Sequence, residues 1–165
     1  MSQSPKPNRK PNPEKPSASL RTRALKLLAR REHSRVELQR KLAPHAEDPA
    51  ALESLLDELM AHGWLAEGRV AEQLIHARRP RFGSGRIRQE LLARGVAEEV
   101  VAAVLPQLKE SDLETARAVW RRKFKAPPAT SAERARQVRF MQGRGFAMHT
   151  IMQVIQSAGA DDENV

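Results

Sequence analysis

The chain has 165 residues, with 29 Lys or Arg against 20 Asp or Glu, so its net charge is +9 when the histidines are neutral. It contains no cysteine, which excludes a disulfide framework, a zinc ribbon and a thiol nucleophile. No apolar run approaches the roughly 20 residues that span a bilayer, and the N-terminus lacks the apolar region of a secretory signal. We therefore expect a soluble, cytoplasmic protein without membrane contact. Its basic excess favours a polyanionic partner such as nucleic acid.

The two ends of the chain differ in composition from its middle. Five of the 11 prolines fall within the first sixteen residues, among Lys, Asn and Ser. Such a segment has little apolar surface to bury, so residues 1–18 are expected to form a disordered leader. Residues 159–165 carry three acids and are expected to form a flexible, acidic end.

Between these ends the apolar spacing predicts helices throughout, and no segment alternates with the period of a strand. Ser19 is expected to cap a first helix, and Ser34 to form a capping box with Glu37 at the start of a second. Asp48 and Pro49 supply the cap and first residue of a third.

The third helix carries a stripe of leucines that includes Leu56, and Gly63 follows it as a helix-ending residue. The next helix is expected over 67–79. Another should run from Ser84 to Gly95.

The following helix is expected to close at Pro106. Ser111 and Glu114 then predict a further capping box. After that helix, Pro127-Pro128 breaks the chain and Thr130 restarts it.

The aromatic residues Trp120 and Phe124 have helical spacing, so packing in a core is favoured over stacking on nucleic-acid bases. In the last helix, Met148, Ile151 and Ile155 are expected to face inward.

An internal repeat divides the helical region. Arg94-Gly95-Val96 corresponds to Arg144-Gly145-Phe146 fifty positions later, and a looser match relates 35–41 to 88–94. Three-helix units of this size are marginal alone, so neighbours should share apolar faces. The expected fold is all-α, with three tandem three-helix modules stacked into an elongated, curved body. The expected modules are 19–62, 63–110 and 111–158, with net charges of +1, +2 and +6.

No catalytic constellation is present, so the chain is not expected to be an enzyme or to need a cofactor. The five histidines are scattered, without metal-ligand spacing. Asp161-Asp162-Glu163 favours a solvated acidic end over a metal site. The turn Gly83-Ser84-Gly85-Arg86 is consistent with two interpretations: a flexible turn with a serine cap, or a helix start whose free amides receive a phosphate.

Clustered bases are the candidate contacts with a partner. Guanidinium groups bind phosphate or carboxylate in a forked geometry, so converging arginines are consistent with a contact surface; a solvated charged face is the other interpretation. The candidates are Arg78, Arg79, Arg81, Arg86, Arg88 and Arg94 in the first cluster, and Arg121, Arg122, Lys123 and Arg144 in the second.

Four stretches in order resemble the RecX family, bacterial regulators of the RecA recombinase. They are Arg31-Glu32-His33-Ser34 with Glu37-Leu38 and Lys41-Leu42; Gly63-Trp64-Leu65 with Arg69; Gly83-x-Gly85-Arg86-Ile87 with Glu90-Leu91 and Arg94-Gly95-Val96; and Phe140-Met141 with Arg144-Gly145-Phe146. The third is the most specific, and the likeness covers about residues 20–157. Ala66 stands where the family usually has an acidic residue, so the helix after it should be capped less well.

The resemblance implies three tandem three-helix modules and a monomer that binds the RecA nucleoprotein filament. It implies that binding restrains ATP hydrolysis and strand exchange in recombination and in DNA repair during the SOS response. The alternative is a sequence-nonspecific protein that acts only by occupying single- or double-stranded DNA. A sequence-specific repressor is less favoured, because few Asn or Gln residues cluster at a helix start.

Overall fold

The structure is a computed structural model that describes residues 18–162, with side chains through 160. This part of the chain contains nine α-helices, one short 3₁₀ helix and no strand. The elements are α1 (Leu20–Leu28), α2 (Arg35–Leu42), η1 (Ala43–His45), α3 (Pro49–Ala61), α4 (Glu67–Arg78), α5 (Ser84–Ala93), α6 (Glu98–Glu110), α7 (Asp112–Lys123), α8 (Ser131–Gly143) and α9 (Met148–Asp162). No helix in 18–162 is long and apolar enough to cross a membrane.

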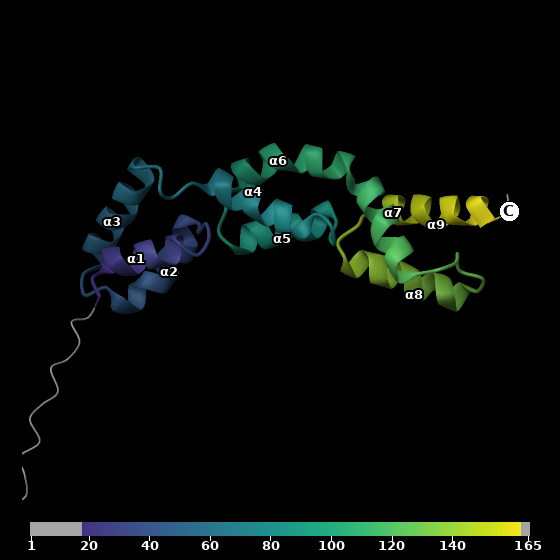
Figure 1. Cartoon of the computed structure of the whole chain (residues 1–165), viewed down its shortest axis with the longest axis horizontal. Coiled ribbons are helices and arrows are strands. Elements are labelled where there is room, and N and C mark those ends of the chain that lie inside the picture. The colour runs from purple at the N-terminus through teal and green to yellow at the C-terminus, as the bar shows by residue number, and fades with distance from the viewer. Residues whose placement is uncertain (1–17, 163–165) are drawn as a thin grey trace, which may run out of the picture.

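The helices form three groups of three in a row, and the row bends into an arch (Figure 1). Helices α2, α5 and α8 follow one another along the lower, inner edge of the arch. The all-α, elongated and curved architecture expected from the repeat is therefore confirmed. The proposed leader over 1–17 lies outside the described residues.

Each group of helices has its own buried apolar core. The first core is built around Leu38, Leu42 and Leu56, which are fully buried. The second forms around Ile87 and Leu91, and the third around buried side chains of α7, α8 and α9. Separate cores define three domains, which we name first, second and third in chain order.

Local capping signals predicted most of the helix starts. The Ser19 side chain accepts a hydrogen bond from the Thr22 amide, and Ser34 and Glu37 form the expected capping box. Asp48 caps α3 through the Ala50 amide. Ala66 makes no side-chain cap on α4, as its departure from the family pattern implied.

One expected helix end, at Pro106, and one expected capping box, at Ser111, are wrong. Pro106 lies inside α6, which continues to Glu110 because Leu108 is buried in the second core. That burial offsets the backbone hydrogen bond that proline cannot donate. Ser111 does not cap α7; its hydroxyl instead donates to the Leu108 carbonyl and accepts from Arg79.

The last helix also differs from expectation. Met148, the first residue of α9, is exposed, while Val154 joins Ile151 and Ile155 in the third core. Helix α9 continues to Asp162, past the module end expected at 158. Gly159 alone does not stop it, since glycine in a helix costs only about 1 kcal/mol relative to alanine.

The same turn closes the middle helix of the second and third domains. Gly95 has a φ of 76° and Gly145 a φ of 88°, a left-handed conformation that favours glycine. The residue after each, Val96 or Phe146, donates its amide to a carbonyl in the last turn of the helix. The fifty-residue repeat read from the sequence therefore corresponds to a repeated helix end.

The first domain repeats the second with a different offset from the one expected. The N-cap residues Ser34 and Gly83 are 49 positions apart, as are Asp48 and Ala97. The predicted offset of 53 positions is wrong. It aligned two Arg-x-Glu-Leu segments, but one lies at the start of α2 and the other lies in the middle of α5.

Candidate partner-binding site

The second and third domains meet where α5 begins. The Gly83 amide donates to the Arg144 carbonyl at 2.8 Å, and the Gly85 amide donates to the Gly145 carbonyl at 3.2 Å. A Cβ atom on Gly145 would lie 2.5 Å from the Arg86 nitrogen, so the backbones touch here without side chains between them. We call this contact the second junction.

The start of α5 is also occupied by a carboxylate from the same chain. Asp112 is buried and accepts hydrogen bonds from the Ser84 amide, at 2.9 Å, and from the Ser84 hydroxyl. The carboxylate stabilises the helix N-terminus as a bound anion would. The phosphate interpretation of Gly83–Arg86 is therefore wrong, and the serine-cap interpretation is wrong too, because Gly83 is the N-cap residue.

A basic hollow lies beside the second junction. It has a volume of about 290 Å³ and contains no acidic side chain in its lining. We call it the junction hollow. Its lining residues are Arg81, Val119, Arg122, Lys123, Phe140 and Arg144. Four of the ten candidate contacts, drawn from both basic clusters, thus converge at one place.

Aromatic rings position the cations of the junction hollow. The Arg144 guanidinium lies 5.2 Å from the centre of the Phe82 ring and 5.1 Å from that of Phe140. The Lys123 ammonium lies 5.7 Å from the Phe140 ring. Arg81 is exposed, and its side chain has no ion-pair or hydrogen-bond partner within 18–160. The junction hollow therefore holds Arg144 and Lys123 against aromatic rings and leaves Arg81 available to an anion.

The other arginines of the first cluster mainly stabilise the fold. Arg78 and Arg86 both form ion pairs with Glu90, at 2.7 Å and 3.5 Å. Arg88 pairs with Glu98 at 2.9 Å. These pairs are partly exposed, so each is worth at most about 1 kcal/mol. Arg79, which donates to Ser111, links the ends of α4 and α6.

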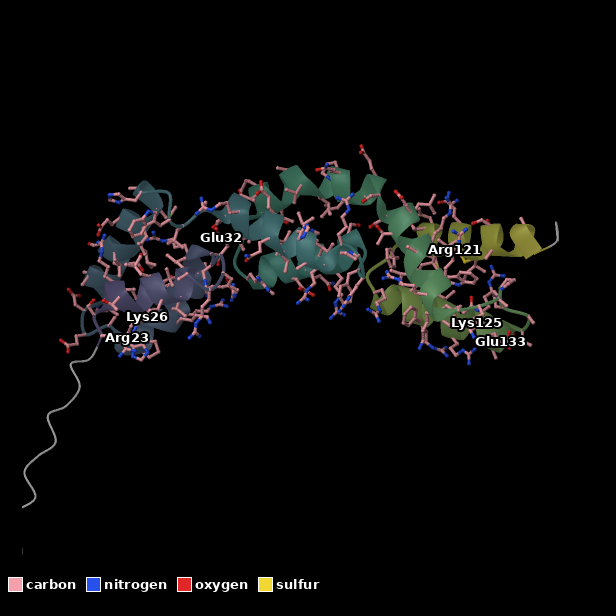
Figure 2. All side chains as sticks on the ribbon, viewed as in Figure 1. Arg23, Lys26, Glu32, Arg121, Lys125 and Glu133 are labelled. Atoms are coloured by element: carbon pink, nitrogen blue, oxygen red, sulfur yellow. The ribbon has the colours of Figure 1, made fainter. Side chains whose placement is uncertain are left out.

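Two remaining candidates lie elsewhere. The Arg94 carbonyl accepts a hydrogen bond from the Ser34 hydroxyl, where the first and second domains meet. Arg121 lines a groove between α7 and α9, away from the junction hollow, and Figure 2 shows it beside α7 and α9. The ten candidates therefore do not form one continuous surface.

The Trp120 ring belongs to the third core. Its side chain is only 5% exposed, and its indole nitrogen donates to Gln137 at 2.9 Å. Phe124 packs edge-on against Phe140, with ring centres 5.4 Å apart. The expectation of core packing rather than base stacking is confirmed for Trp120.

The first and second domains meet through a similar contact, the first junction. Glu32, seen between these domains in Figure 2, pairs with Arg69 at 2.9 Å, and Arg69 also donates to the Gly63 carbonyl. A Cβ atom on Gly95 would lie 2.6 Å from the Val36 side chain. At both junctions the start of one middle helix meets the turn that ends the next.

A buried histidine lies beside the first junction. His33 is 2% exposed, with Nδ1 2.9 Å from the Arg31 carbonyl. Burial lowers the pKa of His33 below its usual 6.5, and the charges of Arg31 and Lys41 lower it further. Burial would raise the pKa of Glu37, but hydrogen bonds from Arg31 and the Ser34 amide, with nearby arginine charges, lower it overall.

Protonation of His33 should destabilise the fold as the solution is acidified. Since the pKa is lower in the folded chain, the neutral form stabilises the fold above about pH 6.5, and this stabilisation is lost as pH falls toward the folded pKa. Urea unfolding at about pH 7.5 and about pH 5.5 should show a smaller difference for His33→Gln than for the wild type. Equal differences would contradict the assignment. Glu37 does not interfere, because its pKa is lowered in the fold: its ionised form stabilises the fold fully above about pH 4.5, and this stabilisation is lost only below that pH.

No group of three or more His, Asp or Glu side chains suited to a metal ion occurs among the described residues. The acidic segment 161–163, weighed above as a metal site, lies outside the described side chains.

Family models match the two domains that form the second junction. Residues 67–105 match the second three-helix domain of RecX, and residues 110–155 match the third. The chain is 49% identical over 150 residues to the regulatory protein RecX of Leptothrix cholodnii, covering 91% of this chain and 96% of that relative. The chain belongs to the RecX family. The chain is also 49% identical over 142 residues to the regulatory protein RecX of Ralstonia nicotianae, covering 86% of this chain and 89% of that relative.

Solved structures support the fold. A crystal structure of RecX from Lactobacillus salivarius matches with a TM-score of 0.73 at 14% identity, covering 84% of this chain and 94% of that one. A second RecX crystal structure matches with a TM-score of 0.69 at 19% identity. The family is a regulatory one by name, and it is not a known enzyme family.

The sequence did not indicate three residues that build the site. Asp112 binds the start of α5, but its partner Ser84 is 28 positions away, so no local sequence pattern indicates this role. Phe82 and Phe140 hold cations through contacts between elements. Phe140 belongs to a stretch that resembles the RecX family, but that resemblance did not indicate a role in holding cations.

Proposed function

We propose that this RecX-family chain binds the RecA nucleoprotein filament and mainly inhibits its ATP hydrolysis and strand exchange. The observation that carries this proposal is the junction hollow, where four cations gather without an acid on an arched body. Arg81 and Lys123 are the proposed contact residues, with Arg122 and Arg144 beside them. They would bind acidic side chains or DNA phosphates of the filament.

The shape of the body suits a long partner. Three domains in a row present their middle helices along one edge of an arch (Figure 1). Such a body contacts several repeating units of a filament, whereas a compact domain of the same mass contacts one. Binding that prefers one filament conformation slows hydrolysis by shifting the population toward that conformation. No catalytic group of the chain is needed for this.

Removing two cations from the junction hollow should weaken filament binding. Arg81→Ala with Lys123→Ala should lower the affinity for preformed RecA filament by about 10-fold or more, since each charge-assisted contact is worth about 1 kcal/mol or more. Co-sedimentation with filament measures this affinity. Arg117→Ala with Lys125→Ala is the matched control, because both residues are exposed and line the α7–α9 groove instead. Equal losses in both variants would contradict the role of the hollow.

The alternative function is occupation of DNA alone, and the basic surface supports it as well. The two functions differ in what excess naked DNA does. If the chain recognises filament, competitor DNA should leave inhibition of a preformed, stable filament largely intact. If it only occupies DNA, competitor should abolish inhibition, and inhibition should fall steeply with salt.

A further inference from the structure

A second basic hollow lies in the first domain, where no feature of the sequence indicated a binding site. It has a volume of about 290 Å³ and is formed by α1, the end of α2 and η1. We call it the first-domain hollow. Its lining residues are Arg23, Lys26, Leu27, Arg30, Lys41, Leu42 and His45. Figure 2 shows Arg23 and Lys26 at the lower side of the first domain.

The acids of the first domain pair with other residues, so the cations of the first-domain hollow lie together without an acid among them. Residues 20–62 hold eight bases and seven acids, a net charge of only +1. Five of the acids pair with arginines outside the hollow, and Asp48 caps α3. The paired acids are Glu32, Glu37, Glu53, Asp57 and Glu58. The seventh acid, Glu47, does not line the hollow. The small net charge of residues 20–62 therefore hides an uneven distribution, with the acids outside the hollow and four cations around it.

The cations of the first-domain hollow are available for binding. Lys26, Arg30 and Lys41 are exposed, and none has an ion-pair or hydrogen-bond partner within residues 18–160. Arg23 is half-buried, and its side chain donates one hydrogen bond within residues 18–160, to the Ala18 carbonyl. Four like charges held close together repel one another in the free protein. A polyanion would relieve that repulsion and release its own counterions.

The lining favours a nucleic-acid backbone over an acidic protein surface. The lining holds four cations, Arg23, Lys26, Arg30 and Lys41, and no acidic side chain. Interfaces with DNA are strongly positive, whereas the cores of protein interfaces are depleted of charged residues. The lining contains no Asn, Gln, Phe, Tyr or Trp residue that would read bases or stack on them.

We propose that the first-domain hollow is a DNA-phosphate site, through which the chain contacts the backbone of DNA without regard to base sequence. With the junction hollow it gives the arched body two separate cationic contacts, in different domains. The proposal does not depend on the filament function, because it concerns naked DNA directly.

The test is the salt dependence of DNA binding by the full chain. The variant Lys26→Ala/Arg30→Ala/Lys41→Ala removes three phosphate contacts. Binding to a fluorescein-labelled oligothymidine and to a labelled duplex is followed by fluorescence anisotropy at several salt concentrations. The slope of log affinity against log salt should become shallower by about 2 for the single strand and about 3 for the duplex. Affinity at about 0.1 M salt should fall roughly 10-fold or more.

The matched control removes the same residue types elsewhere. Lys109→Ala/Arg117→Ala/Lys125→Ala also removes two lysines and one arginine, all exposed and outside both hollows. It should lower DNA affinity less than about 3-fold. Exchanging the hollow cations, Lys26→Arg/Arg30→Lys/Lys41→Arg, should retain binding. Because the substituted side chains are exposed, the helix content and melting temperature of all variants should stay at wild-type values.

Three results would overturn the proposal: no DNA binding by the wild type, equal losses in the two alanine triples, or an unchanged slope in the hollow triple. If the hollow triple lost affinity for filament while keeping its affinity for naked DNA, the hollow would belong to an acidic protein surface instead. The filament function would fail separately, through an absence of binding by the wild type to preformed RecA filament.

Discussion

Replacing Gly145 with alanine should destabilise the chain by about 3 kcal/mol and separate the third domain from the second. Gly145 has a φ of 88°, which costs a side-chain-bearing residue about 1 kcal/mol or more. The added Cβ would also lie 2.5 Å from the Arg86 nitrogen, where backbone has no room to move. Relieving that contact would break the hydrogen bonds that the Gly83 and Gly85 amides donate across the second junction.

Gly143→Ala is the matched control, two residues earlier. Gly143 lies in α8 with nothing within 4 Å of the position of its Cβ, so alanine should be neutral or stabilise by up to about 1 kcal/mol. Urea unfolding followed by Trp120 fluorescence, in a Trp64→Phe background, measures both variants in the third domain. Similar stabilities for the two would show that the second junction does not need a glycine.

Leu56→Ala should cost about 2–5 kcal/mol, because Leu56 is fully buried in the first core and its truncation leaves a cavity. The three cores are separate, so the loss should be confined to the first domain. Hydrogen exchange should therefore accelerate in α1–α3 and change little in α7–α9.

The matched control is Leu25→Ala on α1, since Leu25 is 36% exposed and is not among the residues of the first core. It should cost less than about 1 kcal/mol. Acceleration of exchange throughout the chain by Leu56→Ala would mean that the domains unfold as one unit.

Local signals predicted the elements, and contacts between distant residues account for what they missed. The capping box of Ser34 and Glu37 spans four residues, so the sequence shows it directly. Ser111 and Glu114 have the same spacing, but Arg79 and the Leu108 carbonyl engage the Ser111 hydroxyl. Such competition is invisible in a short window of sequence.

The candidate site was predictable in part, for a related reason. Clusters of arginine indicated where cations are dense, but not which of them pair with acids across helices, as Arg78 does with Glu90. In the first domain the structure shows the opposite case, a group of unpaired cations that no cluster in the sequence indicated. A net charge of +1 suggested no site there, yet pairing elsewhere leaves Lys26, Arg30 and Lys41 without an acid beside them. The net charge of a segment counts its charged residues, whereas the fold determines which cations pair with acids and which remain unpaired.

ATP hydrolysis by a preformed RecA filament, measured as this chain is added, tests the central claim most directly. The wild type should reduce the rate in a saturable manner, and Arg81→Ala/Lys123→Ala should need about 10-fold more protein for the same reduction. The Arg117→Ala/Lys125→Ala control should follow the wild-type curve. An unchanged hydrolysis rate at saturating wild-type protein would contradict the account.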